Sequence, residues 1–488
     1  MNLTRKDFLI GTAAFAATGP YAAFARPDTP SLMRLGMIAD VHLETGENGK
    51  GVQNCLCYEP ALRYFDERKA DGVLVAGDIT DFGTGAALRQ VADIWFKVFP
   101  DNRRSDGKPI VPLFIYGDHD MGGYMHKGYR EWAKTACTVP GELDEIISDG
   151  DNAARLWKEC FREDWAPIQV KECCGYPVVL AHHPLHTKAS DHGNTIPGLA
   201  AFLAKQNIDP KKPFFFVQHR VFRGTVGVEA SCGWESGKTT EVLKKYPNAI
   251  AVCGHGHLNA TDDLNLWQGE FTAIEVPSIN YCCTRRGREN GYHSADKAAI
   301  MPKAYITKSW QGMFGTMYAD RFVVERRDFL NGLPLGPDWV IPLPSQDGSL
   351  RTEVRRRRAV APQFAPDAKV TVSEATVVNR AKKSTDAVIV SFPVAHETAN
   401  APRAFDYVVA AKKDGKVLQE KAVFSNGQFW ADRLDTSPVR CAFAKSDLPN
   451  DWHTSVTFTV APRDSFGNCG NHIDFLPDIR RSSAESRG

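Results

Sequence analysis

The sequence lacks an excess of charge of either sign. Its 59 lysine and arginine residues are matched by 58 aspartate and glutamate residues, so the formal net charge is only +1. A balanced chain has no broad electrostatic field that attracts a polyanion. We therefore exclude nucleic acid and anionic membranes as bulk electrostatic partners, and any recognition of an anion has to be local.

After residue 25 the chain also lacks an apolar run of the ~20 residues needed to cross a bilayer, so we expect no transmembrane helix in the mature chain. The first 25 residues are different. Arg5 and Lys6 precede an alanine-rich apolar stretch, and residues 23–25 offer small side chains for cleavage. This segment resembles a twin-arginine export signal in which lysine replaces the second arginine. We expect export to the periplasm or the extracellular space, with a Sec signal or an uncleaved anchor as alternatives.

The chain has twelve cysteines, and an oxidising compartment would allow some of them to form disulfides. Cys441 and Cys469 fall in the same late region of the chain, and we predict that they are bonded to each other. Cys253 lies inside an apolar run and is predicted to be a small buried side chain.

The length of 488 residues exceeds one ordinary core and indicates two domains. Buried strands alternate with helical stretches over residues 33–328, which predicts an α/β domain with largely parallel strands. Residues 329–366 are expected to be a linker and domain edge. Four arginines at 355–358 are interpreted as a solvated face, with an anion or partner site as the alternative. From 367 to 480 the apolar period is two, which predicts a small fibronectin-like or immunoglobulin-like β-sandwich.

Acidic and histidine side chains follow the predicted strands of the first domain at the point where each strand ends. In α/β folds the carboxyl ends of parallel strands gather at one edge, where sites form. The predicted strands at 35–39, 73–76, 111–116, 213–217 and the run at 251–253 have this feature. Their tips carry Asp40, His42, Asp78, Asp118, His119, Asp120, His219, His255 and His257.

The last of these tips reads Gly254-His255-Gly256-His257. Glycines on either side of His255 allow a sharp turn that brings both imidazoles toward one point. Histidine is the commonest side-chain ligand of zinc, iron and similar metals. A His-x-His pair alone is weak evidence for a metal, but the matching tips strengthen it.

In order and spacing, these motifs resemble those of the calcineurin-like metallophosphoesterase superfamily: D-x-H, GD-x-x-D, GNH-D/E, a histidine after a strand, and GH-x-H. The resemblance covers residues 33–325 and implies two packed sheets flanked by helices, an αββα sandwich. It also implies two metal ions at the strand ends. One ion would be held by Asp40, His42, Asp78 and His257, and the other by Asp78, Asp118, His219 and His255, with Asp78 shared.

The implied activity is hydrolysis of a phosphomonoester or phosphodiester, with a small phosphate ester as substrate. Nitrogen and oxygen ligands suit iron, manganese or zinc without choosing among them. By the resemblance, His119 would contact the phosphate or the leaving oxygen, and Asp120 could orient its ring. A non-catalytic exported surface or binding protein with the same fold is the alternative, and the β-sandwich could contact a glycan or a cell-wall partner.

Several positions depart from the family pattern. Asp118 stands where the family has asparagine, which adds a negative charge to a centre that must receive an anion. Arg220 and Arg223 follow His219 and are interpreted as surface arginines, with a grip on an anionic substrate as the alternative. His182, in the sequence His182-His183-Pro184, also fits the motif of a histidine after a strand and is an alternative to His219 as the ligand. We prefer His219 because it has the expected spacing to the last motif. Asp81 occupies the place of a tyrosine ligand in purple acid phosphatases and is expected to pack or orient rather than ligate.

Overall fold

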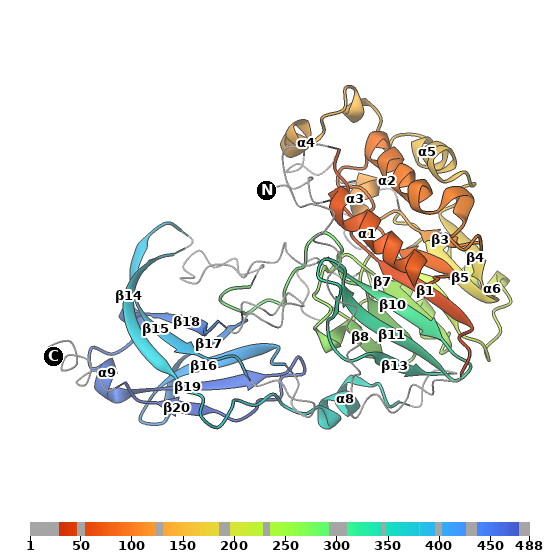
Figure 1. Cartoon of the computed structure of the whole chain (residues 1–488). Helices are drawn as coiled ribbons and strands as arrows, with labels where there is room; N and C mark the ends of the chain where they lie inside the picture. The colour runs from red at the N-terminus through yellow and green to blue at the C-terminus, as the bar shows by residue number, and fades with distance from the viewer. Residues whose placement is uncertain are drawn as a thin grey trace.

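The chain forms two lobes, seen in a computed structural model (Figure 1). The described residues are 29–45, 54–122, 130–184, 196–227, 235–291, 310–343, 348–379, 381–395, 403–425 and 437–477. The predicted export segment, residues 1–25, lies outside them. No helix within the described ranges is long and apolar enough to span a membrane.

The first lobe contains two mixed sheets. In one, β1 and β2 and then β2 and β3 pair in parallel, and antiparallel strands continue the sheet on the other side of β1 in the order β10, β11, β12, with β13 also on β11. These strands are β1 (Met33–Ile38), β2 (Gly72–Val75), β3 (Val111–Phe114), β10 (Gln311–Met317), β11 (Arg321–Asp328), β12 (Leu333–Pro334) and β13 (Trp339–Pro342).

The second sheet has the order β4-β5-β6-β7-β9-β8, with parallel pairing from β5 through β9 and antiparallel strands at both edges. Its strands are β4 (Ile168–Cys173), β5 (Tyr176–Ala181), β6 (Phe214–Val217), β7 (Ala249–Cys253), β8 (Leu266–Gln268) and β9 (Thr272–Glu275). Every residue of β6 and β7 is buried, as expected for central parallel strands covered on both faces.

The two sheets pack face to face, and helices cover their outer faces. Side chains such as Leu35 and Leu74 of the first sheet meet Phe215 and Val252 of the second in one apolar cluster. Helices α1 (Asn54–Glu67), α2 (Gly85–Val98) and α5 (Asn152–Phe161) contribute to a cluster on the outside of the first sheet, and α6 (Leu199–Lys205) and α7 (Lys238–Leu243) to one on the outside of the second. The predicted αββα sandwich is therefore confirmed.

The second lobe consists of two antiparallel sheets, β14-β15-β18 and β17-β16-β19-β20, with one apolar core between them. Their strands are β14 (Thr371–Val378), β15 (Ser384–Phe392), β16 (Asp406–Lys413), β17 (Lys416–Val423), β18 (Val439–Ala444), β19 (Val456–Arg463) and β20 (Ile473–Phe475). Asp414 and Gly415 join β16 to β17 in the left-handed conformation, as a tight hairpin requires. This all-β domain confirms the prediction of a sandwich.

A buried ionic contact connects the two lobes. Asp406, at the start of β16, accepts hydrogen bonds from Arg463 of β19 and from Arg288 of the first lobe at 2.7–2.8 Å. Arg288 belongs to the segment 278–291, which contacts the β-sandwich at two further residues. The backbone N–H of Glu289 donates to the carbonyl oxygen of Ala422, and the side chain of Asn290 forms two hydrogen bonds with the backbone of Phe424. The β-sandwich is thus tied to the segment that leaves the second sheet after β9.

Three sequence-based expectations need correction. The predicted linker begins later than residue 329, because β12 and β13 pair with β11 and belong to the first sheet. Cys441 and Cys469 are both free: Cys441 points into the sandwich core from β18, whereas Cys469 is exposed in the loop after β19. In α8 (Thr352–Arg358) three arginines are exposed as predicted, but Arg355 donates to the carbonyl oxygens of Asp263 and Leu266 and packs against the first lobe.

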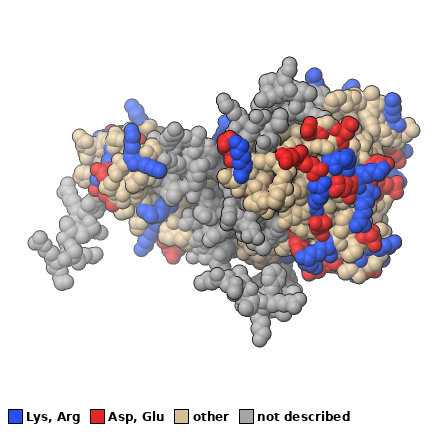
Figure 2. All heavy atoms as spheres, turned by 90° about the horizontal axis from the view of Figure 1, so that it is seen from above, with Lys and Arg blue, Asp and Glu red and all other residues tan. Residues whose placement is uncertain are grey.

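Charge is mixed on the face of the molecule drawn in Figure 2, where basic and acidic side chains alternate over the first lobe. This arrangement agrees with the balanced composition of the chain and its net charge of +1.

Candidate metal centre

All seven predicted metal ligands lie beyond the carboxyl ends of parallel strands from both sheets. The two sheets are packed together, so the tips of β1, β2 and β3 meet those of β6 and β7. The side chains brought together are Asp40, His42, Asp78, Asp118, His219, His255 and His257, and each is buried, with at most 8% of its surface exposed.

The backbone at this centre is unusual. Asp40, His42, Asp78, His255 and His257 have φ angles between 47° and 68°, in the left-handed region that non-glycine residues rarely adopt. Such conformations cost free energy and persist where the surrounding structure holds them, often at functional sites. In this chain they turn the side chains out of the strand direction and toward one another.

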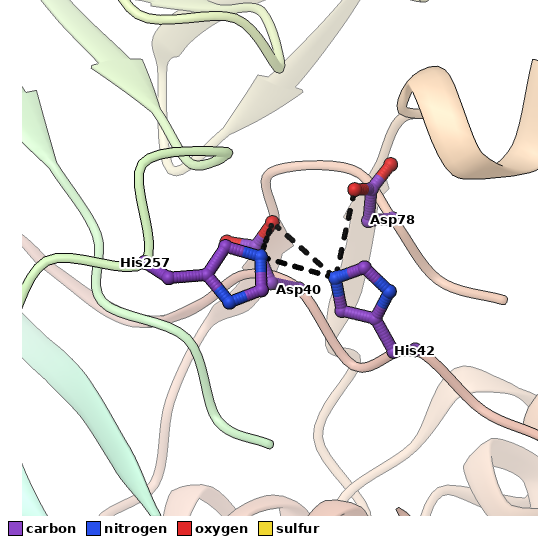
Figure 3. Close-up of side chains that lie close together, drawn as sticks. All are labelled: Asp40, His42, Asp78 and His257. Atoms are coloured by element: carbon purple, nitrogen blue, oxygen red, sulfur yellow. Dashed lines mark hydrogen bonds and ion pairs between the residues drawn. The ribbon is translucent and has the colours of Figure 1, made fainter. Parts of the chain in front are cut away.

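The first cluster consists of Asp40, His42, Asp78 and His257 (Figure 3). The two Nε2 atoms of His42 and His257 lie 3.1 Å apart, and Nε2 of His257 is 3.2 Å from Oδ1 of Asp40. Oδ2 of Asp78 is 3.6 Å from Nε2 of His42. Two imidazole nitrogens and two carboxylates thus face one point.

The second cluster consists of Asp78, Asp118, His219 and His255. Nε2 of His219 lies 3.0 Å from Oδ2 of Asp78 and 2.9 Å from Oδ1 of Asp118. Nδ1 of His255 is 3.2 Å from the same Oδ1 of Asp118. Oδ2 of Asp78 therefore takes part in both clusters, as a bridging ligand would.

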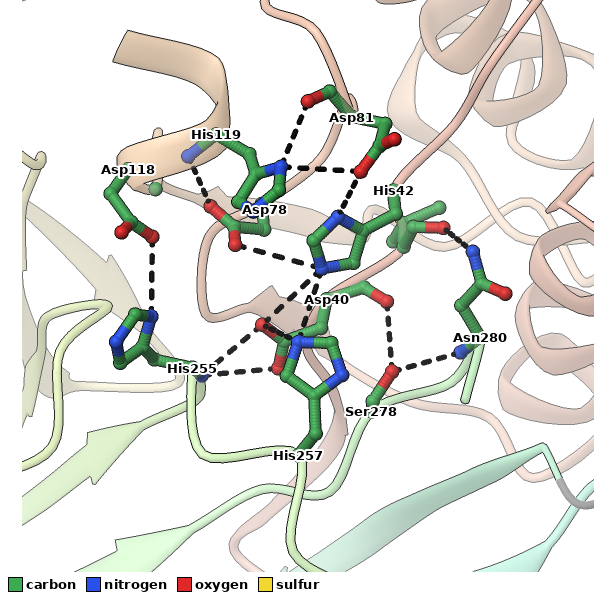
Figure 4. Close-up of polar contacts among 12 residues, drawn as sticks. Asp40, His42, Asp78, Asp81, Asp118, His119, His255, His257, Ser278 and Asn280 are labelled. Carbon is green, nitrogen blue, oxygen red and sulfur yellow. Dashed lines mark hydrogen bonds and ion pairs between the residues drawn. The ribbon is translucent and has the colours of Figure 1, made fainter. Parts of the chain in front are cut away.

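Hydrogen bonds to main-chain carbonyl groups orient His219 and His257. Nδ1 of His219 lies 2.8 Å from the carbonyl oxygen of Ala76, and Nδ1 of His257 lies 3.0 Å from that of Tyr281. A carbonyl oxygen can only accept, so both Nδ1 atoms carry the proton, and in the neutral ring Nε2 presents a lone pair to its cluster. Nδ1 of His42 is 2.8 Å from Oδ1 of Asp81, which orients that ring in the same way (Figure 4).

These donor sets fit two metal ions. Nε2 of His219 and Oδ1 of Asp118 are fully buried and have no hydrogen-bond partner. Nitrogen lone pairs and carboxylate oxygens packed at about 3 Å repel one another unless a proton or a cation lies among them. The mixed nitrogen and oxygen ligands suit iron, manganese or zinc.

The neighbouring histidines favour the ionised form of the carboxylates at this centre. Burial by itself raises the pKa of Asp78, but the neighbouring His219 and His119 outweigh it and hold that pKa below its ordinary value. The same balance, with His257 as the main opposing group, lowers the pKa of Asp40. Both side chains are therefore ionised at neutral pH, as metal ligands must be.

The segment after β9 supports Asp40 and was missed by the sequence analysis. Oγ of Ser278 donates to the carbonyl oxygen of Asp40, and Nδ2 of Asn280 donates to that of Val41, each at 3.1 Å (Figure 4). The available signal was the pair of polar residues Ser278 and Asn280, which come shortly after the buried strand β9 as the proposed ligands come after the other strands.

His119 lies beside the first cluster, with its ring 4.5 Å from that of His42. Its Nδ1 donates to the carbonyl oxygen of Asp81 at 2.8 Å and lies 3.2 Å from Oδ1 of the same residue. Asp120 does not orient this ring, contrary to the expectation. Its carboxylate instead accepts from the backbone N–H groups of Ile79, Thr80 and Gly117 and fixes the turn that carries Asp78.

His182, the rival of His219, belongs to neither cluster. Its Nδ1 accepts a hydrogen bond from the backbone N–H of Tyr116, and its ring packs among Tyr116, Trp157 and Trp165. Burial, and to a lesser extent Lys171, lowers the pKa of His182 to about 3. This histidine is a neutral core residue.

Arg220 is not a surface residue, which corrects the sequence-based interpretation, whereas Arg223 is exposed as expected. Nη2 of Arg220 donates to Oδ2 of Asp118 at 2.8 Å, and both side chains are more than 90% buried.

Comparison with known proteins places these observations in a family. The model of the calcineurin-like phosphoesterase family matches residues 33–259. A search of curated protein sequences finds no significant match.

A search of solved structures finds similarity to three phosphoesterases among others. A dimetal phosphatase from Danio rerio is 12% identical, with 64% of this chain and 99% of that chain covered and a TM-score of 0.35. A purple acid phosphatase from yellow lupin is 13% identical, with 64% and 53% covered and a TM-score of 0.39. A phosphoesterase from E. coli is 13% identical, with 63% and 98% covered and a TM-score of 0.25.

Proposed function

The chain belongs to the calcineurin-like phosphoesterase family through residues 33–259, and on this premise we propose that it hydrolyses a small phosphomonoester or phosphodiester at a two-metal centre. The observation that carries the proposal is the pair of four-residue clusters that share Asp78. Ions bound there would polarise a phosphoryl oxygen, acidify a water molecule and stabilise charge in an in-line transition state.

His119 is the proposed general acid. Burial disfavours its charged form, but Asp78 and Asp81 outweigh this effect and raise the pKa of His119 well above its ordinary value. Nδ1 is already committed to Asp81, so the proton available to a leaving oxygen is the one on Nε2. Positive ions at the two clusters would lower this pKa again, toward the neutral range in which a general acid works best.

Asp81 contacts both the ring of His42, a proposed metal ligand, and the ring of His119, the proposed acid. The same Oδ1 atom lies 2.8 Å from Nδ1 of His42 and 3.2 Å from Nδ1 of His119. A proposed metal ligand and the proposed acid are thus fixed relative to each other by one buried carboxylate, which preorganises the site.

The test is an assay of the purified chain, loaded in turn with Mn, Fe and Zn, on chromogenic mono- and diesters side by side. We expect turnover of at least one ester, lost in His119→Ala and retained in His453→Ala, because His453 is exposed in the β-sandwich. Absence of turnover with every metal and both esters would contradict the proposal and favour a non-catalytic protein.

We also propose that residues 1–25 direct export. Cell fractionation of the full chain should find it outside the cytoplasm, and replacement of Arg5 and Lys6 by glutamine should retain it inside. Contact of the β-sandwich with a glycan or cell-wall polymer stays a prediction.

A further inference from the structure

The two oxygens of the Asp118 carboxylate have separate partners. Oδ1 faces the second cluster, 2.9 Å from Nε2 of His219 and 3.2 Å from Nδ1 of His255. Oδ2 accepts the hydrogen bond from Nη2 of Arg220 at 2.8 Å. One oxygen is therefore available as a ligand atom, and the other is held by a guanidinium.

The pair also connects the two sheets. Asp118 is the first residue of α3 (Asp118–Gly122), which follows β3 in the first sheet, and Arg220 follows β6 in the second. The side chains are only 8% and 7% exposed. Solvent therefore screens their interaction only weakly. Arg220 also follows the proposed ligand His219 directly in the sequence.

An aspartate at this place raises an electrostatic difficulty. Asp40, Asp78 and Asp118 bring three negative charges to a centre that must accept an anionic ester, and an amide in place of Asp118 would supply a ligand oxygen without charge. A carboxylate with two free oxygens can also bind an ion through both of them, which changes the coordination geometry. The contact of Arg220 with Oδ2 bears on both difficulties, because it adds a positive charge and occupies one of the two oxygens.

We propose that Asp118 and Arg220 act as one unit that substitutes for a neutral amide ligand. Arg220 occupies Oδ2, which leaves Oδ1 as the single ligand atom, and its positive charge offsets that of the carboxylate, which keeps the centre receptive to phosphate. Arg220 is accordingly a positioning residue that acts through Asp118. This inference rests on the proposed two-metal function.

The inference predicts opposite effects on metal and anion binding. Removal of the Arg220 charge leaves more negative charge on the ligands, so metal ions should bind as tightly as in the wild type or more tightly. Phosphate should bind less tightly, by roughly tenfold for the loss of one charge-assisted interaction. A merely structural role of Arg220 would weaken both.

The experiment is a double-mutant cycle on the full chain with Arg220→Met, Asp118→Asn and the double variant, with Arg220→Lys and the exposed Arg223→Met as controls. Metal affinity is measured by competition with a chelator, and binding of inorganic phosphate to the Mn-loaded protein by calorimetry. We expect Arg220→Met alone to lose phosphate affinity, and the double variant to return close to the wild type because neither charge remains. The phosphate affinity of Arg220→Lys should lie between those of Arg220→Met and the wild type, and that of Arg223→Met should equal the wild-type value.

Equal phosphate affinity in Arg220→Met and the wild type would overturn the inference, and so would a double variant as impaired as Arg220→Met. If Arg220→Met does not fold, the double variant decides: recovery of folding and phosphate binding supports charge compensation, and failure to recover contradicts it. A wild-type chain that binds no metal would contradict the proposed function itself, which is a distinguishable result.

Discussion

Nδ1 of His257 donates a hydrogen bond to the carbonyl oxygen of Tyr281, 3.0 Å away, and thereby fixes which nitrogen of the ring faces Asp40. His255, two residues earlier, points its Nδ1 at Asp118 instead. The two histidines of one short motif therefore belong to different clusters.

Replacement of each histidine should remove a different ion. We expect His257→Ala to lose the ion of the Asp40 cluster and His255→Ala the ion of the Asp118 cluster, so that metal content falls from about two ions per chain to about one in either variant. Elemental analysis after dialysis measures this, with His453→Ala as the exposed control. Unchanged metal content in both variants would contradict the assignment.

Gly77 tests the position of His219. Its φ is 89°, and a Cβ atom added there would collide with the His219 ring, whereas Gly175 has φ 81° and no atom near an added Cβ. Alanine at either position costs about 1 kcal/mol of backbone strain. Only Gly77→Ala should also weaken metal binding, measured by chelator competition; equal metal affinity in the two variants would show that His219 is not a ligand.

His182 predicts a specific dependence of stability on pH. In the folded chain the pKa of this ring is lowered to about 3 from its ordinary 6.5, mainly by burial. In the unfolded chain the His182 ring binds a proton near pH 6.5, whereas in the folded chain it stays neutral until about pH 3. The free energy of unfolding therefore falls as the pH drops from 6.5 toward 3. Between pH 7 and 5 this one group should account for about 2 kcal/mol.

His182→Asn removes the titrating group and keeps an acceptor for the backbone N–H of Tyr116. Urea unfolding at pH 7 and 5 should therefore show a smaller loss of stability in this variant than in the wild type. His453→Asn, at an exposed position, should behave as the wild type. An identical pH dependence in all three chains would refute the explanation.

Asp406 should stabilise the junction of the two lobes. Its fully buried carboxylate is shared by Arg288 and Arg463, so Asp406→Ala removes the negative charge that both arginines contact at the junction. We expect a loss of about 3–5 kcal/mol in the free energy of unfolding, as for other broken buried ion pairs. Chemical denaturation measures it, and Asp386→Ala, which removes an exposed contact to Thr376, should cost far less. Equal costs would contradict the importance of the junction.

The sequence predicted which side chains meet in the two clusters, because each of them is an aspartate or histidine that follows the end of a buried strand. Arg220 was misjudged because its partner Asp118 lies 102 residues away and meets it only when the two sheets pack. Strand β10 was not predicted, since Gly312 and Gly315 interrupt its apolar pattern. All seven of its residues are buried, so the strand also lacks the alternation of apolar and polar side chains that indicates one exposed face. The position of Ser278 after β9 is a local signal, but its support of Asp40 depends on the contact between β1 and the segment after β9, which forms only in the folded chain.

Anomalous diffraction from crystals of the chain grown with Mn or Zn would locate the ions at the two clusters. We expect two peaks about 3.5–4 Å apart, one among Asp40, His42, Asp78 and His257 and the other among Asp78, Asp118, His219 and His255. A single peak, or no peak at these side chains, would contradict a two-metal centre.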